Sequence, residues 1–512
     1  MEILSSIGSW IYTNIFTTAD MLLLVLCFIG QMINRKGLKN ALAGGLKCLI
    51  GFNVYSTATS TMTSTFRPLL YALKDAFGME VVINDVYYGN SAMLTYFEEH
   101  GGNAGQAGIV LWIAFGLMIA FALFKKITKV RDLPLQGHGL VVEATRNLIL
   151  ISLLAPVLDG WQLIIIAALF MATKMSCIGN ISVEASQDLT DGSGMTVAHN
   201  QMFLDGVMYK IGMKIEKDTL KKTGRLPRKI DDLELPGWLS IFNDVYVACF
   251  IVMFIFFGAI MLIMGQQTFI DLGFTTPDAS FLMYIFNTAA TFPISLVIMF
   301  TGLKMFSAEI MASFDGISEK LLHGVLPGID VAAFYGFCGN PNVITLGFLV
   351  GTLLMIISTI IMALLNVPVI VMVGYTQMMF DNASVGMFGY KRGGLKGLLL
   401  GVLLVAIADT WLAASFGMAT GLYVTGGLAA PSDTSILYGT FGWLFKLGVP
   451  GIIAVIIIIG LIPTVQYIFT KDKEDYWLVA SDWDAYKAKH PELETPIVNS
   501  SNLDESNLQA SE

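Results

Sequence analysis

The sequence predicts an all-α, polytopic membrane protein with about 11 transmembrane segments, several of them broken or re-entrant. Hydrophobic residues make up 55% of the chain and charged residues only 13%, and the mean hydropathy is +0.68. This composition leaves too little polar surface for a water-soluble globule. Apolar runs of about 20 residues, the length that crosses a hydrocarbon layer of about 30 Å, recur along the chain. Clusters of Lys and Arg separate many of these runs.

The apolar runs locate the expected spans. The first, at residues 19–33, follows no basic region and precedes no small-residue cleavage site, so we expect a retained span and no signal peptide. A short run at 41–52 leads into the segment STATSTMTSTFRP (56–68), which is too polar for lipid. We expect it to be either a broken or re-entrant helix along the substrate path or an external loop. Later spans are expected at 108–124, 140–158, 161–175, 245–264, 281–306, 344–365, 367–379, 395–416 and 436–469, the last broken near Pro450.

Charge distribution predicts the topology. Basic residues gather at 35–39, 125–131, 210–229, 391–396 and 471–473, and we interpret 210–229 as the largest basic loop. Because cytoplasmic loops are enriched in Lys and Arg, the N-terminus is expected outside and the C-terminus in the cytoplasm. The chain divides into a membrane domain at 1–470 and an acidic tail at 471–512, whose polar composition predicts disorder.

Several function classes are excluded at this stage. No stretch has the density of cations and aromatic residues that a nucleic-acid surface needs. No metal-ligand spacing, nucleotide-binding glycine loop or hydrolase motif occurs, so we expect no cofactor and no ATP hydrolysis by this chain. The scattered cysteines lie mostly in apolar stretches, where a thiol behaves as a small hydrophobic group.

Four segments combine ionisable residues with other polar groups. Such residues are costly in apolar surroundings and are therefore functional candidates in a membrane protein. Carboxylates, imidazoles and amides that converge from different helices suit the hydroxyls of a sugar or polyol. The segments are INDVYYGN with Asp85 and Tyr87, GHGLVVEATRN with His138, Glu143 and Arg146, TDGSGMTVAHNQ with Asp191, His199, Asn200 and Gln201, and FDGISEKLLHGVLPGID with Glu319 and Asp330.

The candidates differ in strength. Asp330 has apolar neighbours and needs a partner or an aqueous cavity, so it is the strongest candidate. His199 lies among polar, glycine-rich residues, which favours a functional role. His138 could instead be a hydrated histidine at the end of a span, and Glu143 and Arg146 could pair on one helix face. Isolated acids near segment ends are expected to cap helices or lie at the interface: Asp159, Asp244, Asp271 and Asp409.

The opening MEIL and the segments GFNVYSTATSTMTSTFRP, TDGSGMTVAHNQ, DDLELPGWLSIFND and FDGISEKLLHGVLPGIDVAAFY resemble the ascorbate-specific enzyme IIC, the permease of the bacterial phosphotransferase system. The resemblance extends to about residue 470. It implies a homodimer in the bacterial inner membrane, with a core domain that holds the substrate and a V-motif domain that forms the dimer contact. It also implies a separate enzyme IIB, charged by an enzyme IIA, as phosphoryl donor.

The resemblance further implies a set of substrate-binding residues in this chain: Thr57, Ala58, Thr59, Tyr87, His138, His199, Asn200 and Asp330. The chain departs from the family pattern at three places. Val142 and Asn200 stand where glutamines are expected, and threonines replace the Gly/Ser character of the first polar break. Fewer or shorter amide contacts would suit a small polyhydroxylated substrate other than ascorbate.

Three alternatives remain at this stage. A galactitol-type permease would use the same partners with a different ligand. An ion-coupled secondary transporter would use the intramembrane carboxylates for protons or sodium and leave its substrate unmodified. A membrane sensor or scaffold would not transport, and the converging polar clusters argue against it. The basic cluster at 210–229 could receive an anionic phosphoprotein or could simply reflect topology.

Overall fold

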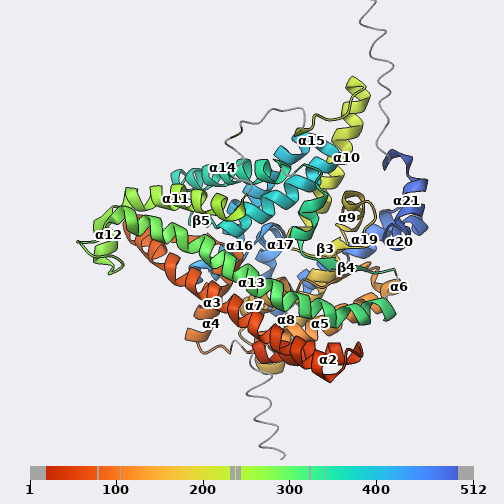
Figure 1. The fold of residues 1–512 in the computed structure, drawn as a ribbon, viewed down its shortest axis with the longest axis horizontal. Coiled ribbons are helices and arrows are strands. Elements are labelled where there is room, and N and C mark those ends of the chain that lie inside the picture. Colours follow the sequence, from red (N-terminus) through yellow and green to blue (C-terminus); the bar gives the residue numbers. More distant parts are fainter. Residues whose placement is uncertain are drawn as a thin grey trace, which may run out of the picture.

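The computed structural model describes residues 19–77, 80–103, 105–230, 244–321, 324–340 and 342–493, together with 237 and 241. The MEIL opening and most of DDLELPGWLSIFND lie outside these residues. The described chain is mostly helical (Figure 1). Within it, six helices are long and apolar enough to cross a membrane, at Gln106–Leu123, Gly160–Gly179, Tyr246–Met264, Asn342–Leu364, Gln377–Thr420 and Val449–Phe469.

Large apolar side chains on these helices point outward. Ile263 is 76% exposed and Leu364 is 75% exposed. Exposed surface of this kind on a helix of membrane-spanning length is what lipid covers. The protein is therefore a multi-pass membrane protein, and the count of about 11 crossings stays a prediction.

Five helices form one packing group, which we call the arm helices. The longest two run side by side, and a buried contact joins the first arm helix to the last through Gln31 Nε2, which donates to Glu309 Oε2 at 2.7 Å. Figure 1 shows the two long helices crossing the whole molecule. The arm helices are α2 (Ala19–Ile33), α3 (Leu38–Phe77), α11 (Val245–Met264), α12 (Gln266–Asp271) and α13 (Phe281–Leu321).

The remaining helices form the body of the protein. The first half of the chain contributes α4 (Val86–Glu99), α5 (Gln106–Leu123), α6 (Lys125–Thr128), α7 (Gly137–Leu154), α8 (Gly160–Gly179), α9 (Val183–Thr190) and α10 (Met202–Thr223). The second half contributes η4 (Val331–Phe337), α14 (Asn342–Leu364), η5 (Gln377–Asp381), α15 (Asn382–Ile407), η6 (Ala408–Leu412), α16 (Ala413–Thr420), η7 (Leu422–Thr425), α17 (Ser432–Phe441), η8 (Gly442–Leu447), α18 (Val449–Gly460) and α19 (Ile462–Phe469).

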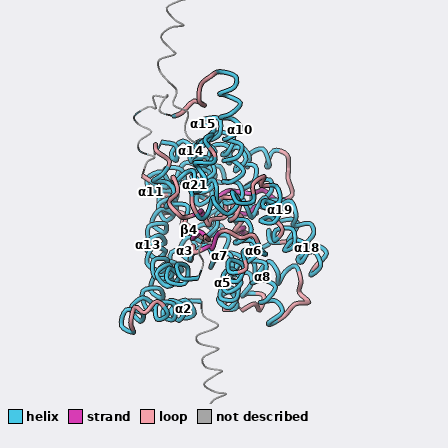
Figure 2. Tube along the Cα trace, turned by 90° about the vertical axis from the view of Figure 1, so that its right-hand side faces the viewer, coloured by secondary structure: helices cyan, strands magenta, loops and turns pink. Residues whose placement is uncertain are grey.

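Two small parallel sheets lie inside the helical body, where the strands are visible among the helices in Figure 2. Sheet A has the order β5-β1-β6, with β1 (Glu80–Asn84), β5 (Val369–Val373) and β6 (Gly427–Leu428). Sheet B has the order β2-β4-β3, with β2 (Asp132–Pro134), β3 (Thr196–Val197) and β4 (Leu326–Ile329). The sequence predicted no strands, because short buried strands have the same apolar composition as helix segments.

The two sheets repeat one connectivity with the halves of the chain exchanged. In each sheet the central strand follows a long arm helix, α3 before β1 and α13 before β4. The two flanking strands come from the other half of the chain. An aspartate ends each central strand and caps the next helix, Asp85 in sheet A and Asp330 in sheet B. These two residues therefore occupy equivalent positions.

The structure corrects both readings of the polar segment at 56–68. It is neither a loop nor a broken helix but part of the continuous helix α3. Hydroxyl groups bond to the carbonyl one turn earlier, as Thr57 does with Asn53 at 2.9 Å and Thr61 with Thr57 at 2.9 Å. Helices accommodate Ser and Thr in this way.

Two further expectations are wrong. The predicted span at 367–379 begins with strand β5, whose residues are all buried, as in a parallel strand covered on both faces. The predicted basic loop at 210–229 is mostly helix α10, which ends at Thr223 before Gly224 in the left-handed conformation. The break predicted near Pro450 is confirmed, because a new helix, α18, starts at Val449 after Gly448.

The start of the expected disordered tail is folded. Residues 473–493 form α20 (Lys473–Ser481), α21 (Trp483–Lys489) and η9 (Pro491–Leu493). Apolar side chains spaced along these helices are buried, including Tyr476, Val479 and Trp483. The acidic composition of the whole tail concealed this short amphipathic segment. Residues 494–512 lie outside the described residues.

Candidate functional site

The carboxyl ends of the three strands of sheet B meet at one edge. Two backbone hydrogen bonds close this edge, from Leu135 N to Gly328 O at 2.7 Å and from Ala198 N to Ile329 O at 2.9 Å. Loops that leave the ends of neighbouring parallel strands form a crevice in which ligands commonly bind. Here they bring together Gln136 after β2, His199 after β3 and Asp330 after β4. We call this set of loops the sheet B edge.

Asp330 is anchored but not enclosed. Its Oδ1 accepts from Ala332 N at 2.7 Å and its Oδ2 accepts from Gln136 Nε2 at 3.0 Å. The residue itself is half-buried. A carboxylate held by a helix cap and an amide, with part of its surface exposed, can still accept hydrogen bonds from a ligand hydroxyl.

The side-chain network around His199 fixes its ring. Asp381 accepts from Ser432 N at 2.8 Å and from Ser432 Oγ at 2.7 Å, and also from Gln201 Nε2. Because a carboxylate only accepts, this contact orients the Gln201 amide with its oxygen toward His199 Nδ1. Nδ1 then carries the proton, and in the neutral ring Nε2 carries the lone pair. The imidazole of His199 is half-buried in this network.

Asn200 belongs to a buried charged network. Its Oδ1 accepts from Lys174 Nζ at 2.7 Å, and the same ammonium donates to Glu143 Oε1 at 2.9 Å and to Thr434 Oγ1 at 2.8 Å. All four residues are buried. With its oxygen engaged, Asn200 offers a ligand its amide nitrogen, which is a donor.

The same network joins the loops of both sheets. Glu143 and Arg146 form an ion pair on α7, and the Arg146 Nη1 atom donates to the Ala429 carbonyl after β6 at 2.5 Å. The expected pairing of Glu143 with Arg146 is thus present. Asp433 on α17 accepts from Phe203 N at 2.8 Å at the start of α10. Unpaired charges are costly in a buried site, and here Glu143 is paired with both Arg146 and Lys174, while the Asp433 carboxylate accepts backbone hydrogen bonds.

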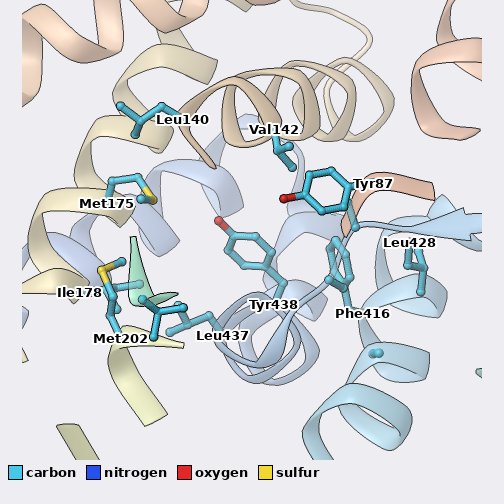
Figure 3. Close-up of a cluster of buried hydrophobic side chains, with 14 of the residues drawn as sticks. Tyr87, Leu140, Val142, Met175, Ile178, Met202, Phe416, Leu428, Leu437 and Tyr438 are labelled. Carbon is cyan, nitrogen blue, oxygen red and sulfur yellow. The ribbon is translucent and has the colours of Figure 1, made fainter. Parts of the chain in front are cut away.

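The other predicted residues lie apart from this edge or outside the described side chains. Tyr87 follows sheet A on α4, is buried, and lies with Val142 and Tyr438 between α4, α7 and α17 (Figure 3). Thr57 is exposed and Ala58 is buried on α3. Thr59 and His138 lie in α3 and α7, and their side chains are outside those described.

Sequence reasoning missed Gln136, Lys174 and Asp381. Gln136 follows the short apolar segment Leu133–Leu135, which contains Pro134, and that segment was the one local signal that could have marked it. Lys174 and Asp381 lie inside apolar runs, and a charge there is a functional candidate in a membrane protein. Of the four acids expected as caps or interface residues, Asp244 caps α11 through Tyr246 N and Val247 N. Asp409 instead lies fully buried within η6.

Comparison with known proteins identifies relatives of this chain. A family model described as the sugar-specific permease component of the PTS system, EIIC-GAT, matches residues 14–436. The ascorbate-specific PTS system EIIC component of Mycoplasma pneumoniae is 26% identical over an alignment of 429 residues, and the match covers 76% of this chain. The chain covers 64% of the length of that relative, which is less than two thirds.

Proposed function

The chain belongs to the family of sugar-specific permease components of the phosphotransferase system, and we propose that it carries L-ascorbate, or a similar small polyhydroxylated compound, into the cell. The substrate leaves as its phosphate ester. A separate enzyme IIB, charged by an enzyme IIA, donates the phosphoryl group. The observation that carries the proposal is the sheet B edge, where an aspartate, a histidine and an asparagine follow two adjacent strands of one sheet.

We assign a separate role in substrate binding or phosphoryl transfer to each of these residues. Asp330 accepts hydrogen bonds from substrate hydroxyls, and Asn200 donates one from its amide nitrogen. Phosphoryl transfer needs a positioned hydroxyl whose proton is accepted. We assign that acceptance to His199, because imidazole is the side chain that most often transfers protons in active sites and this one lies half-buried at the sheet B edge. Tyr87 on α4, His138 on α7, and Thr57, Ala58 and Thr59 on the arm helix α3 stay further candidate contacts on the strength of the family resemblance and not of a contact with the sheet B edge.

The proposal extends to topology and assembly. The arm helices form the V-motif domain of a homodimer, and the body is the core domain that moves against it in the bacterial inner membrane. The N-terminus lies outside and the C-terminus in the cytoplasm. Basic residues near α6, at the end of α10 and before α20 support this orientation. The exposed lysines of α10 give an acidic face of enzyme IIB a docking surface.

The test is uptake of radiolabelled ascorbate by cells that express the chain with its own enzymes IIA and IIB. We expect accumulation of the phosphate ester, and its loss in Asp330→Asn and His199→Ala. Asp278→Asn and His100→Ala are matched controls, since both residues are exposed and lie outside the proposed site. Accumulation of unmodified ascorbate driven by an ion gradient would overturn the proposal in favour of a secondary transporter.

A galactitol-type or other polyol permease is the second candidate, and Val142 is the observation that favours it. Val142 is fully buried beside Tyr87, so an apolar side chain stands where the resemblance implies an amide (Figure 3). An amide lost from a sugar site removes hydrogen bonds that distinguish one polyol from another. Phosphorylation of galactitol but not of ascorbate in the same cells would retain the mechanism and change the substrate.

A further inference from the structure

The C-terminal helices cover the end of sheet B that lies opposite the site. We call residues 473–493 the C-terminal clamp. Its buried side chains form an apolar cluster separate from the main core, made of Val183, Leu326, Val479, Ala480, Trp483, Tyr486 and Leu493. Leu326 is the first residue of β4, and Val183 begins α9, which leads into β3. Figure 1 shows α20 and α21 beside α9, α19 and the strands of sheet B.

Arg131 connects the clamp to sheet B. Its guanidinium lies over the Tyr476 ring at 3.9 Å, and Nη1 donates to Tyr476 O at 2.9 Å. Nε and Nη2 donate to the side chain and the carbonyl of Asn180, which follows α8. Asn180 Nδ2 in turn donates to Tyr476 Oη at 2.8 Å. A buried, stacked guanidinium that donates a hydrogen bond from each of its three nitrogens is a rigid joint, because its planar fork allows one arrangement.

Arg131 also makes the first rung of the sheet. Its carbonyl accepts from Leu326 N at 2.8 Å, which sets β2 against β4 at the clamped end. At the other end of the same two strands, Gln136 donates to Asp330. A strand of three residues, such as β2, spans only about 10 Å. A shift at Arg131 therefore reaches the Gln136 and Asp330 pair through one short, stiff element.

Two more contacts fasten the clamp to neighbouring elements. Arg392 on α15 donates through Nη2 to Asp188 on α9 at 2.5 Å and to the Leu493 carbonyl at 2.8 Å. The Trp483 ring packs so closely on Gly192 that a Cβ there would lie 2.5 Å from Trp483 Cδ1. Gly192 belongs to the turn before β3, whose far end carries His199. The clamp thus contacts the approach to all three strands.

We propose that the C-terminal clamp is a positioning element for the sugar site: it fixes the amino ends of β2, β3 and β4 so that Gln136, His199 and Asp330 meet at their carboxyl ends. The inference rests on the proposed function of the sheet B edge. The buried, bonded attachment distinguishes the clamp from a lid that opens in each transport cycle. Its loss should weaken substrate binding at Gln136 and Asp330, and it should slow phosphoryl transfer to a smaller extent because His199 is positioned by the same sheet.

The test compares three chains in cells that contain enzymes IIA and IIB: full length, ending after residue 493, and ending after residue 472. The chain ending at 493 is the control, because it keeps the clamp. We expect the chain that lacks the clamp to raise the KM for ascorbate uptake about 5-fold to 20-fold, since small misplacements of binding groups are costly. Vmax per protein in the membrane should fall by a smaller factor than the KM rises, because His199 is only one of the groups displaced.

If the chain ending at residue 472 does not reach the membrane, point variants test the positioning role of the clamp. Arg131→Lys keeps the charge but loses the stacked fork, so it should raise KM in the same way. Lys126→Arg, an exchange of the same two residue types at an exposed position outside the joint, is the matched control and should stay close to wild type. An unchanged KM in Arg131→Lys, or a lower Vmax at unchanged KM, would overturn the inference. No ascorbate uptake by the full-length chain would instead count against the proposed function, so the two failures are distinguishable.

Discussion

Sheets A and B share one topology, but they treat their equivalent aspartates differently. Asp85 in sheet A is completely buried and accepts four hydrogen bonds, from Tyr87 N, Tyr88 N, Thr376 N and Thr376 Oγ1, at 2.5 to 3.1 Å. Asp330 in sheet B is half-buried and accepts from Ala332 N and Gln136 Nε2. The aspartate that follows the central strand is therefore fully buried in sheet A and half-buried in sheet B.

The loops after the third strand of each sheet differ in the same direction. In sheet A, β6 leads into Ala429 and Ala430, both fully buried. In sheet B, β3 leads into Ala198 and then His199, which is half-buried. Burial of small apolar residues fills space in sheet A, whereas sheet B presents an imidazole. This difference supports the proposal that sheet B, and not sheet A, binds the ligand.

Replacing Asp85 or Asp330 with asparagine should give the largest difference between the two sheets. We expect Asp330→Asn to reduce substrate uptake by about 100-fold or more, because it removes an acceptor from the proposed site. Asp85→Asn should instead lower the amount of folded protein, because an amide nitrogen would face backbone donors in a buried site. Uptake per folded protein and the unfolding temperature in detergent measure the two effects. Equal loss of stability in both variants would break the comparison.

Disrupting the charged network that joins the loops of the two sheets should have the next largest effect, on the stability of the fold. Lys174→Met should destabilise the fold by about 3 to 5 kcal/mol, because it leaves the buried Glu143 without one of its two cationic partners. The double variant Lys174→Met with Glu143→Gln should recover part of the loss. Thermal unfolding of the purified proteins measures both, with the exposed Lys446→Met, far from the network, as control. A single variant as stable as wild type would show that the network does not hold the sheets together.

Adding a side chain to the close contact between α4 and sheet A should lower the stability of the fold by a smaller amount. A Cβ at Gly89 on α4 would lie 2.2 Å from the Leu428 carbonyl carbon, so Gly89→Ala should cost about 1 to 3 kcal/mol. Gly116→Ala on α5 is the matched control, because a Cβ there meets nothing within 4 Å and alanine favours helix. Unfolding temperatures compare the two. A neutral Gly89→Ala would mean that sheet A is packed more loosely than the structure indicates.

The smallest effect concerns pH and the C-terminal clamp. Partial burial lowers the pKa of His490, but its hydrogen bonds with Glu492 and Asp475 outweigh this, and the net pKa lies above its ordinary value. A raised pKa in the folded state means that the stabilisation is complete below about pH 6.5 and is lost as pH rises through the folded pKa. Hydrogen exchange of residues 473–493 should therefore increase between pH 6 and 9 by more than base catalysis explains. In His490→Gln this excess should vanish.

How much the sequence predicts depends on the kind of signal. The membrane class, the long helices and the strength of Asp330 and His199 as candidates follow from local composition and from the cost of charge in an apolar environment. The two sheets do not follow from local composition, because the sequence of β5 resembles one more apolar membrane span and β3 is only two residues long. The contacts of Lys174 at the site could not be predicted from local sequence either. Its three partners lie 26, 31 and 260 residues away, a convergence that no local pattern contains.

We propose that the substrate binds at the sheet B edge and not at the equivalent edge of sheet A. A crystal or cryo-EM structure of the purified full-length protein with bound ascorbate would locate the ligand. We expect ligand density within hydrogen-bonding distance of Asp330 and His199, with the Asn200 amide nitrogen facing it. Density beside Asp85 and Ala430, with the sheet B edge occupied only by protein and water, would contradict it.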